Sequence, residues 1–294
     1  MAVYLNPNAQ AFDEAVNSDI YVDKTEMIAE INSVIGTKQK YVSVSRPRRF
    51  GKTMAADMLC AYYGRNNENA KDLFVNRKLA RNNPYDWDKE LGKYDVIRLV
   101  MTDFIKKDID IDKSLRLIKK RILDELNEQY PLVNYDEDDL FYSMEKFYLK
   151  TNTQFVIVLD EWDAVFRIRK DDKEGQNEYL DFLRDWFKDR NYVALAYMTG
   201  ILPIKKYGEH SALNMFDEYS MISPMQLAEY TGFTNEEVKE LCKSYNMDMS
   251  VVSEWYDGYV VTDSIPLDKR DLYRKGIVGQ FSRQKICHFI MNLC

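Results

Sequence analysis

The sequence contains few of the residues on which several classes of protein depend. Its four cysteines form no CxxC pair, and it has two histidines, so we expect reduced thiols and no disulfide framework. Cys287, His288 and Cys294 lie close together but have no second cluster to complete a metal site, and none is predicted from them. No apolar run approaches the roughly 18 residues of a membrane span, and residues 1–16 lack the basic and apolar segments of a signal peptide. We therefore expect a cytoplasmic protein without a membrane span.

Basic residues are fewer than acidic ones. Lysine and arginine number 41 against 48 aspartates and glutamates, which gives a net charge of −7 and a pI near 5.2. A protein that coats nucleic acid through charge needs a basic surface, so the composition argues against that class, although Arg46, Arg48 and Arg49 form a local basic cluster. Hydrophobic residues make up 46% of the chain, which is enough for a sizeable core. The length allows one large α/β domain, alone or with a smaller module.

Short apolar runs alternate with amphipathic stretches through the first two thirds of the chain. The apolar runs predict strands, and apolar residues that recur every three or four positions predict helices. Strands are predicted at 40–45, 94–100, 155–159 and 192–198, and helices at 21–35, 52–63, 114–126 and 179–188. The first helix is predicted to start at a capping box of Asp23 and Glu26. Because strands alternate with helices, the pattern predicts an α/β fold with a mostly parallel, doubly wound sheet.

After Pro224 the pattern becomes helical. Thr234 and Glu237 form a second pair with capping-box spacing, and apolar residues follow at helical intervals. The predicted parts of the chain are a core at 1–224, a small C-terminal helical lid at 225–262 and a tail at 263–294. The tail shows no clear periodicity, and we interpret it either as a divergent ending or as the truncated start of a further region.

The segment S-R-P-R-R-F-G-K-T at residues 45–53 joins a predicted strand to a predicted helix. In this setting Gly51 lets backbone N–H groups approach a phosphate closely, Lys52 supplies a cation to its oxygens, and Thr53 offers a hydroxyl to Mg²⁺. The triplet alone could be an ordinary turn, but the strand before it and the helix after it favour a phosphate-binding loop. We therefore predict a P-loop that binds ATP, with Thr53 as a ligand of Mg²⁺.

This loop departs from the usual motif in two places. Arg46 stands where the first glycine is expected, and Pro47 has no N–H. An anion-binding nest is built from successive backbone N–H groups, and here mainly from those nearest the lysine. We accordingly predict that the nucleotide is contacted by Arg48, Arg49 and Phe50 as well as by Gly51, Lys52 and Thr53. The sequence does not determine whether the loop has the usual P-loop geometry.

The most apolar of the predicted strands ends in two carboxylates. Val156 to Leu159 runs directly into Asp160 and Glu161, as in the Walker B motif, where one carboxylate reaches the Mg²⁺ shell and the next polarises the attacking water. We predict Asp160 as a metal ligand and Glu161 as the catalytic base. The alternatives are a strand that ends in two solvated acids, and a Glu161 that only pairs with an arginine such as Arg48 or Arg167.

The following apolar run ends in Thr199 and Gly200. In the additional-strand class of P-loop NTPases, the strand beside Walker B carries a polar sensor at its tip, and Thr199 is predicted in this catalytic role. A threonine that only caps the strand is the alternative. Tyr21 is a candidate to stack on adenine, against the alternative of a core aromatic. An arginine finger, in cis or across a subunit contact, would be one of five arginines that the sequence does not distinguish: Arg46, Arg48, Arg49, Arg167 and Arg169.

Several of these segments resemble the prokaryotic AAA-ATPase-like family. The resemblance is carried by Y-V-D-K-T at 21–25, R-P-R-R-F-G-K-T at 46–53 and L-D-E-W-D at 159–163, and it continues at 199–203, 231–234 and 255–259. It implies an ATPase core with a helical lid. It also implies that an arginine in place of the first glycine, as at position 46, is usual in the family. Members often carry a C-terminal PD-(D/E)XK-type nuclease domain, which the ending at 280–294 does not resemble.

Two functions fit these features. The first is a P-loop ATPase that hydrolyses ATP with Mg²⁺ to drive a change in a lid or effector. The second is a nucleotide-gated binding module or switch with negligible turnover, and the sequence favours the first only through Glu161. The expected partners are the nucleotide and either a protein effector or further copies of the chain. A nucleic-acid partner is not supported by the charge, and no membrane partner is expected.

Overall fold

The structure is a computed structural model of the chain. It describes residues 3–65, 67, 69–204, 211–221, 223–256, 259–262 and 274–278. Cys287, His288 and Cys294, with most of the predicted tail, lie outside the described residues. Within the described part, no helix combines the length and the apolar composition that crossing a membrane requires.

Five parallel strands form the central sheet, in the order β2-β3-β4-β1-β5. The strands are β1 (Tyr41–Ser45), β2 (Asp95–Val100), β3 (Phe155–Asp160), β4 (Val193–Gly200) and β5 (Asp217–Tyr219). Every residue of β1, β3 and β4 is buried, as expected of central strands that are covered on both faces. The predicted parallel sheet is confirmed. It contains the four predicted strands and, at its edge beside β1, a fifth strand, β5, which the sequence pattern did not indicate.

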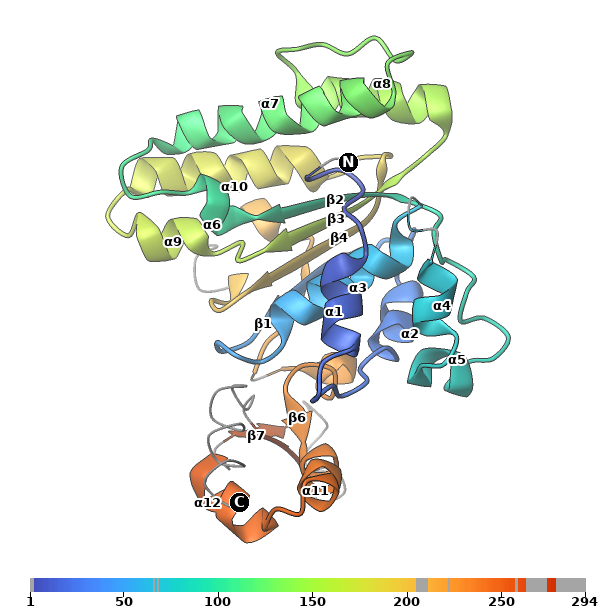
Figure 1. The fold of residues 1–294 in the computed structure, drawn as a ribbon. Helices are drawn as coiled ribbons and strands as arrows, with labels where there is room; N and C mark the ends of the chain where they lie inside the picture. Colours follow the sequence, from blue (N-terminus) through green and yellow to red (C-terminus); the bar gives the residue numbers. More distant parts are fainter. Residues whose placement is uncertain are drawn as a thin grey trace.

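Helices cover both faces of this sheet (Figure 1). One face carries α1 (Gln10–Val16), α2 (Met27–Asn32), α3 (Lys52–Tyr63), α4 (Ala70–Phe74) and α5 (Lys78–Asn82), and the other carries α6 (Met101–Phe104), α7 (Ile111–Gln129), α8 (Leu140–Thr151), α9 (Ala164–Ile168) and α10 (Lys173–Phe187). Alternate residues of β3 belong to the two cores: Val156 and Val158 pack on the side of α3, and Ile157 and Leu159 on the side of α7 and α10. The doubly wound arrangement is therefore confirmed.

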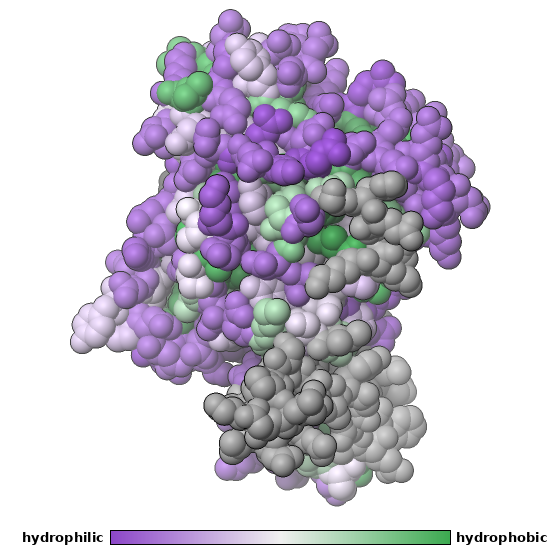
Figure 2. Space-filling model, turned by 180° about the vertical axis from the view of Figure 1, so that it is seen from behind, coloured by the Kyte–Doolittle hydropathy of each residue, from purple (hydrophilic) through white to green (hydrophobic). Residues whose placement is uncertain are grey.

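The outer helices are amphipathic, as their sequences indicate. The buried residues of α7 include Leu115, Ile118, Ile122 and Leu126, which recur every three or four positions and so form one face of the helix. Seen from behind, the surface of the described part is mostly hydrophilic, with hydrophobic residues in small areas (Figure 2).

Three strands end side by side at the carboxyl edge of the sheet. In the register of the sheet Asp160 of β3 lies opposite Thr199 of β4, and Gly200 lies opposite Ser45 of β1. The segment after Ser45 leads directly into α3. Because ligands of open parallel sheets bind beyond the carboxyl ends of the strands, the fold brings the predicted loop, carboxylates and threonine to the usual place for a site.

The first predicted helix is shorter than its pattern indicated. It begins at Met27, and its N-cap residue, Glu26, makes no capping hydrogen bond through its side chain. Asp23 accepts hydrogen bonds from the backbone and hydroxyl of Thr25 and from the backbone N–H of Lys78. The predicted capping box is wrong because this carboxylate ties the segment before α2 to the start of α5.

The segment after Pro224 forms a separate module beyond the edge of the core (Figure 1). It contains α11 (Asn235–Ser244), α12 (Met249–Tyr256) and an antiparallel sheet of β6 (Phe233–Thr234), β7 (Tyr259–Thr262) and β8 (Arg274–Val278) in the order β6-β8-β7. The capping box of Thr234 and Glu237 is confirmed. The module therefore contains strands besides its two helices, and residue 262, where a lid was predicted to end, is the last residue of β7.

Candidate nucleotide-binding site

The loop between β1 and α3 curls around its own lysine. The loop reverses through residues with positive φ, Arg49 at 70° and Gly51 at 74°. The side chain of Lys52 turns back into it, and Nζ donates to the carbonyl oxygen of Pro47 at 2.8 Å. Burial lowers the pKa of the Lys52 ammonium, and the carboxylates nearby oppose this effect. The lysine and the N-terminus of α3, where the first N–H groups of a helix have no partner within it, therefore lie at one loop, which suits an anion.

The loop after β1 and the carboxylate at the end of β3 are in contact. Oγ1 of Thr53 donates to Oδ2 of Asp160 at 2.6 Å, and the backbone N–H of Glu161 donates to Oδ1 at 2.9 Å. Asp160 is almost completely buried, and this burial raises the pKa of its carboxyl, while the Thr53 hydroxyl and the charge of Arg98 lower it. A hydroxyl and a carboxylate in contact are oxygen ligands of the kind that Mg²⁺ prefers, so the donor set fits that ion.

Thr199 lies beside Asp160 with an unused hydroxyl. The side chain is fully buried, and its Oγ1 has no hydrogen-bond partner among the described residues. Buried hydroxyls are nearly always paired in proteins. A bound group could supply the missing partner, and the two roles considered for Thr199, a sensor and a strand cap, both remain compatible with this position.

The side chain of Glu161 makes the ion pair that the sequence left as an alternative. Nη2 of Arg167 donates to its Oε2 at 2.7 Å, whereas Arg48 is exposed on the loop. The Glu161 side chain is 40% exposed and its backbone has a φ of 54°, in the left-handed region. The carboxylate is therefore accessible at the mouth of the site, next to Asp160, and is held there by a salt bridge.

Asp163 is a site residue to which the sequence assigned no role. It is fully buried, and its Oδ2 accepts hydrogen bonds from the backbone N–H groups of Ile201 and Leu202 and from Nε of Arg167. These bonds fasten the turn after β3 to the segment after β4. A side chain at Gly200 would meet the Trp162 ring at 2.7 Å, so a glycine is needed for this close approach. The motif L-D-E-W-D includes Asp163, but no spacing rule in the sequence links this residue to the backbone of residues 201 and 202.

Two of the five arginines belong to the scaffold. Arg46 is fully buried and donates to the carbonyl oxygen of Tyr219 at 2.6 Å and to Oγ1 of Thr231 at 2.9 Å. Burial lowers the pKa of its guanidinium to about 10. Arg169 bonds Asp172 and the carbonyl oxygen of Lys107. Neither is free to act as a finger. Arg46 instead occupies the position of the missing glycine as a strut between β1, β5 and the module.

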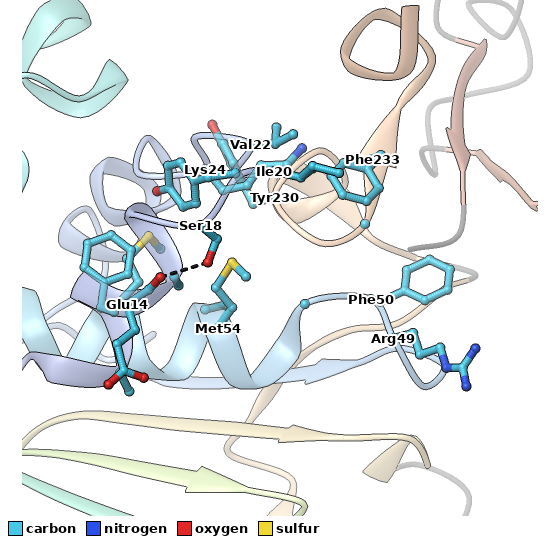
Figure 3. A pocket seen from close by; sticks show the side chains of 18 residues that line it. Glu14, Ser18, Ile20, Val22, Lys24, Arg49, Phe50, Met54, Tyr230 and Phe233 are labelled. Atoms are coloured by element: carbon cyan, nitrogen blue, oxygen red, sulfur yellow. Dashed lines mark hydrogen bonds between the residues drawn. The ribbon is translucent and has the colours of Figure 1, made fainter. Parts of the chain in front are cut away.

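A cavity of about 530 Å³ opens beside the loop. Three segments line it, namely residues 11–24 before α2, residues 49–58 of the loop and α3, and residues 230–233 at the start of the module (Figure 3). Phe50 and Tyr21 are among the lining residues, whereas the guanidinium of Arg49 extends away from the other side chains (Figure 3). Arg77 lies over the ring of Tyr21 at 5.5 Å, so one face of this aromatic is already covered.

The rim of this cavity joins the module to the core. Nζ of Lys24 lies 2.6 Å from Oε2 of Glu237 and also donates to the carbonyl oxygen of Glu229. The backbone N–H of Gly232 donates to the carbonyl oxygen of Phe50 at 2.9 Å. The P-loop is thus bonded directly to the first residues of the module, and residues 230–233 form one side of the cavity.

Comparison with known proteins identifies relatives of the chain. The model of a family described as "AAA-ATPase_like: Predicted AAA-ATPase" matches residues 9–208. A protein described as "Uncharacterized protein in vnfD 5'region", from Azotobacter chroococcum mcd 1, is 24% identical over 259 residues, which are 86% of this chain and 47% of that protein. The chain therefore spans about half the length of this relative.

Three solved structures show a distant likeness. The ORC1 protein of Aeropyrum pernix in complex with DNA is 13% identical with a TM-score of 0.42, covering 82% of this chain and 53% of that one. C. elegans PCH-2 is 13% identical with a TM-score of 0.32, covering 88% and 48%. The Aeropyrum pernix ORC2 protein with ADPNP and ADP is 11% identical with a TM-score of 0.39, covering 77% and 53%.

At these scores the strand order and the loop geometry identify the fold, and the distant likenesses add nothing to them. The family match has a different weight, because it covers more than half of the chain and includes the P-loop, the two carboxylates and Thr199. The chain belongs to the predicted AAA-ATPase family.

Proposed function

We propose that this protein binds ATP with Mg²⁺ in the loop at residues 46–53 and hydrolyses it to drive a change in the lid or in an effector. The observation that carries the proposal is the hydrogen bond between Thr53 and Asp160, with the orphaned hydroxyl of Thr199 beside it. Together they would provide the ligands and the sensor that a P-loop ATPase requires.

Each residue has a distinct task in this proposal. Lys52 exchanges its contact with the Pro47 carbonyl for phosphate oxygens, which are better acceptors for an ammonium because they carry charge. Thr53 and Asp160 would hold Mg²⁺, which neutralises phosphate charge when it is bound. Arg48, Arg49 and Phe50 contribute the loop around the phosphates, with their backbone rather than the two exposed guanidinium groups as the principal contact.

Glu161 and Thr199 would act on the water that attacks the γ-phosphate. A carboxylate with an accessible oxygen can orient the water and accept its proton. The Thr199 hydroxyl would find in the water or the γ-phosphate the partner that it lacks in the protein. Both residues lie next to Asp160 at the carboxyl edge of the sheet, so one bound phosphate could be reached by both.

The cavity beside the loop would hold the adenine and ribose. Its volume of about 530 Å³ lies in the range of small-molecule sites, and such sites combine an apolar lining with a few polar groups. Met54 and Phe233 come from different segments of the lining, so a base between them would contact both the core and the module. Nucleotide binding would then change the contacts between the core and the lid.

The alternative is a nucleotide-gated switch with negligible turnover. The salt bridge between Glu161 and Arg167 favours it, because a carboxylate in an ion pair is less available to a water. The effector would be a protein or a further copy of the chain. We do not propose a nucleic-acid partner, since the chain carries a net charge of −7.

Calorimetric titration with ATP and ADP, in Mg²⁺ and in EDTA, followed by steady-state phosphate release with and without DNA, tests this proposal. We expect binding of both nucleotides, a Mg²⁺-dependent affinity for ATP and measurable release without DNA. Binding without turnover would favour the switch. Absence of binding would refute both functions, and turnover that requires DNA would restore the nucleic-acid partner.

A further inference from the structure

Arg98 of β2 lies on the face of the sheet that carries Asp160. In the register of the sheet Val100 is opposite Asp160, and Arg98 is opposite Val158. Side chains two residues apart in a strand share a face, and Val158 belongs to the core on the side of α3. The guanidinium of Arg98 therefore lies between the sheet and α3, diagonal to the Asp160 carboxylate.

Asp57 of α3 holds this guanidinium. Nη2 of Arg98 donates to Oδ1 of Asp57 at 2.7 Å, and the two side chains are 18% and 17% exposed. Asp57 follows Thr53 by four positions, so both side chains lie on one face of the helix, and helical side chains lean toward the N-terminus. The Asp57 carboxylate therefore lies one turn behind the hydroxyl that bonds Asp160.

One nitrogen of Arg98 has no partner. Its Nε is buried and makes no hydrogen bond among the described residues, although buried donors are nearly always paired. Burial raises the pKa of the carboxyls of Asp57 and Asp160, the charge of Arg98 lowers both, and the charge of Asp160 adds to the rise at Asp57. One positive charge thus faces two negative charges in the layer between α3 and the sheet.

This layer would attract a divalent cation if the guanidinium were absent. Such ions take oxygen ligands, and their affinity rises with the number of charged ligands. Without the guanidinium, the oxygens of Thr53, Asp57 and Asp160 would form a ligand set before a nucleotide bound. An ion held there would be placed by two carboxylates of the protein, whereas Mg²⁺ in nucleotide sites is usually placed with the help of the phosphates.

We propose that Arg98 is a positioning residue that takes the place of a cation beside Asp57 and Asp160, so that a divalent ion binds Asp160 only together with the nucleotide. The inference rests on the proposed nucleotide function, in which Thr53 and Asp160 hold Mg²⁺. No covalent bond changes. Arg98 acts through Asp57, which it keeps away from the metal, and through the positive charge that it sets against Asp160.

The test measures binding of Mn²⁺, a probe for Mg²⁺ sites, to the full chain without nucleotide. Arg98→Met keeps an apolar stem and removes the charge, so its affinity for Mn²⁺ should be at least about tenfold higher than that of the parent. Mn²⁺ should also raise the melting temperature of this variant. Arg98→Lys keeps a cation and should behave as the parent does. Adding Asp57→Asn to Arg98→Met should remove the gain.

Arg65→Met is the matched control. Arg65 pairs with Asp95, a buried carboxylate at the amino end of the same strand, so this variant also takes an arginine from a buried acid. It should lose thermal stability without gaining affinity for Mn²⁺. A gain equal to that of Arg98→Met would show a general effect of unpaired acids and would overturn the proposal.

Asp57→Asn supplies a measurement that does not depend on the folding of Arg98→Met. The guanidinium loses its partner and turns its charge to Asp160, so the gain in ATP affinity from Mg²⁺ should fall by at least about threefold. An unchanged gain in this variant would contradict the inference, and so would equal Mn²⁺ affinities in Arg98→Met and the parent. If the parent binds no ATP, the proposed function itself is wrong. If the parent binds ATP with a dependence on Mg²⁺ and only the variants fail to respond, this inference alone is wrong.

Discussion

Thr53 donates a 2.6 Å hydrogen bond to Asp160 across 107 positions of the sequence. The bond joins the first turn of α3 to the tip of β3, so the two predicted ligands of Mg²⁺ come from elements that the sheet holds side by side. The arrangement depends on β4, which lies between β1 and β3 and places Thr199 beside the carboxylate. The effect of a substitution at Thr53, Asp160 or Thr199 can therefore be predicted from the contact that the substitution removes.

Lys52→Ala should abolish nucleotide binding or weaken it by at least about 10- to 100-fold, because the loop loses its ammonium and with it a charge-assisted phosphate contact. Lys40→Ala is a suitable control, since Lys40 is a partly buried lysine just before β1, at the opposite end of that strand, and bonds the carbonyl oxygens of Arg190 and Val193. Calorimetry on both variants checks the prediction. Parental affinity in Lys52→Ala would show that the loop is not the phosphate site.

Asp160→Ala should make nucleotide affinity insensitive to Mg²⁺. The buried carboxylate is the only acidic side chain bonded to Thr53 in the described part of the chain, and without it the metal-bound and metal-free nucleotides should bind alike. Titrations with ATP in Mg²⁺ and in EDTA measure this difference. A Mg²⁺ dependence equal to that of the parent would remove Asp160 from the metal shell.

Asp160→Asn should stabilise the nucleotide-free protein at neutral pH. Burial raises the pKa of the Asp160 carboxyl in the folded state, so the folded protein binds this proton more tightly than the unfolded chain. Parental stability contributed by this group therefore falls as the pH rises through the folded pKa. We expect a melting temperature about 2–4 °C above the parent at pH 7, with a smaller gain toward pH 4. A gain that grows as the pH falls has the wrong sign and contradicts the assignment.

Lys24→Met should loosen the module from the core. The substitution keeps an apolar stem but removes the ion pair with Glu237 and the bond to the Glu229 carbonyl, of which the first is largely buried. Faster proteolysis of the segment around residue 230 and a dissociation rate of the nucleotide at least about threefold higher are expected. Lys71→Met serves as the control, because its pair with Asp88 is exposed. Equal behaviour of the two variants would mean that this contact does not hold the lid.

The strands could be predicted, and the candidate site proposed, because their signals are local. β1 to β4 are short segments rich in β-branched and other apolar residues. The loop directly follows β1, and the two predicted Walker B acids stand at the end of β3. The three residues of β5 are too few to produce a pattern. β6 pairs with β8 across more than 40 positions, and no local periodicity encodes such a pairing.

The remaining differences come from tertiary contacts of polar side chains. Asp23 had the spacing of a helix cap, but its carboxylate accepts a hydrogen bond from the backbone N–H of Lys78 at the start of α5. In the sequence Arg46 resembled a free cation, but its guanidinium is buried and donates hydrogen bonds to the carbonyl oxygen of Tyr219 and the hydroxyl of Thr231. Which partner a polar group finds depends on segments that are distant in the sequence, so spacing alone could not decide between these roles.

Phosphate release by the parent and by Glu161→Gln, measured beside ATP affinity and melting temperature on the same preparations, tests the central claim most directly. The neutral amide keeps the shape of the side chain but cannot accept a proton. We predict that binding survives while turnover falls by about 10²–10⁴-fold. Equal turnover per folded molecule in the two proteins would contradict the catalytic role of Glu161, and a parent that binds ATP without measurable turnover would make the protein a nucleotide switch.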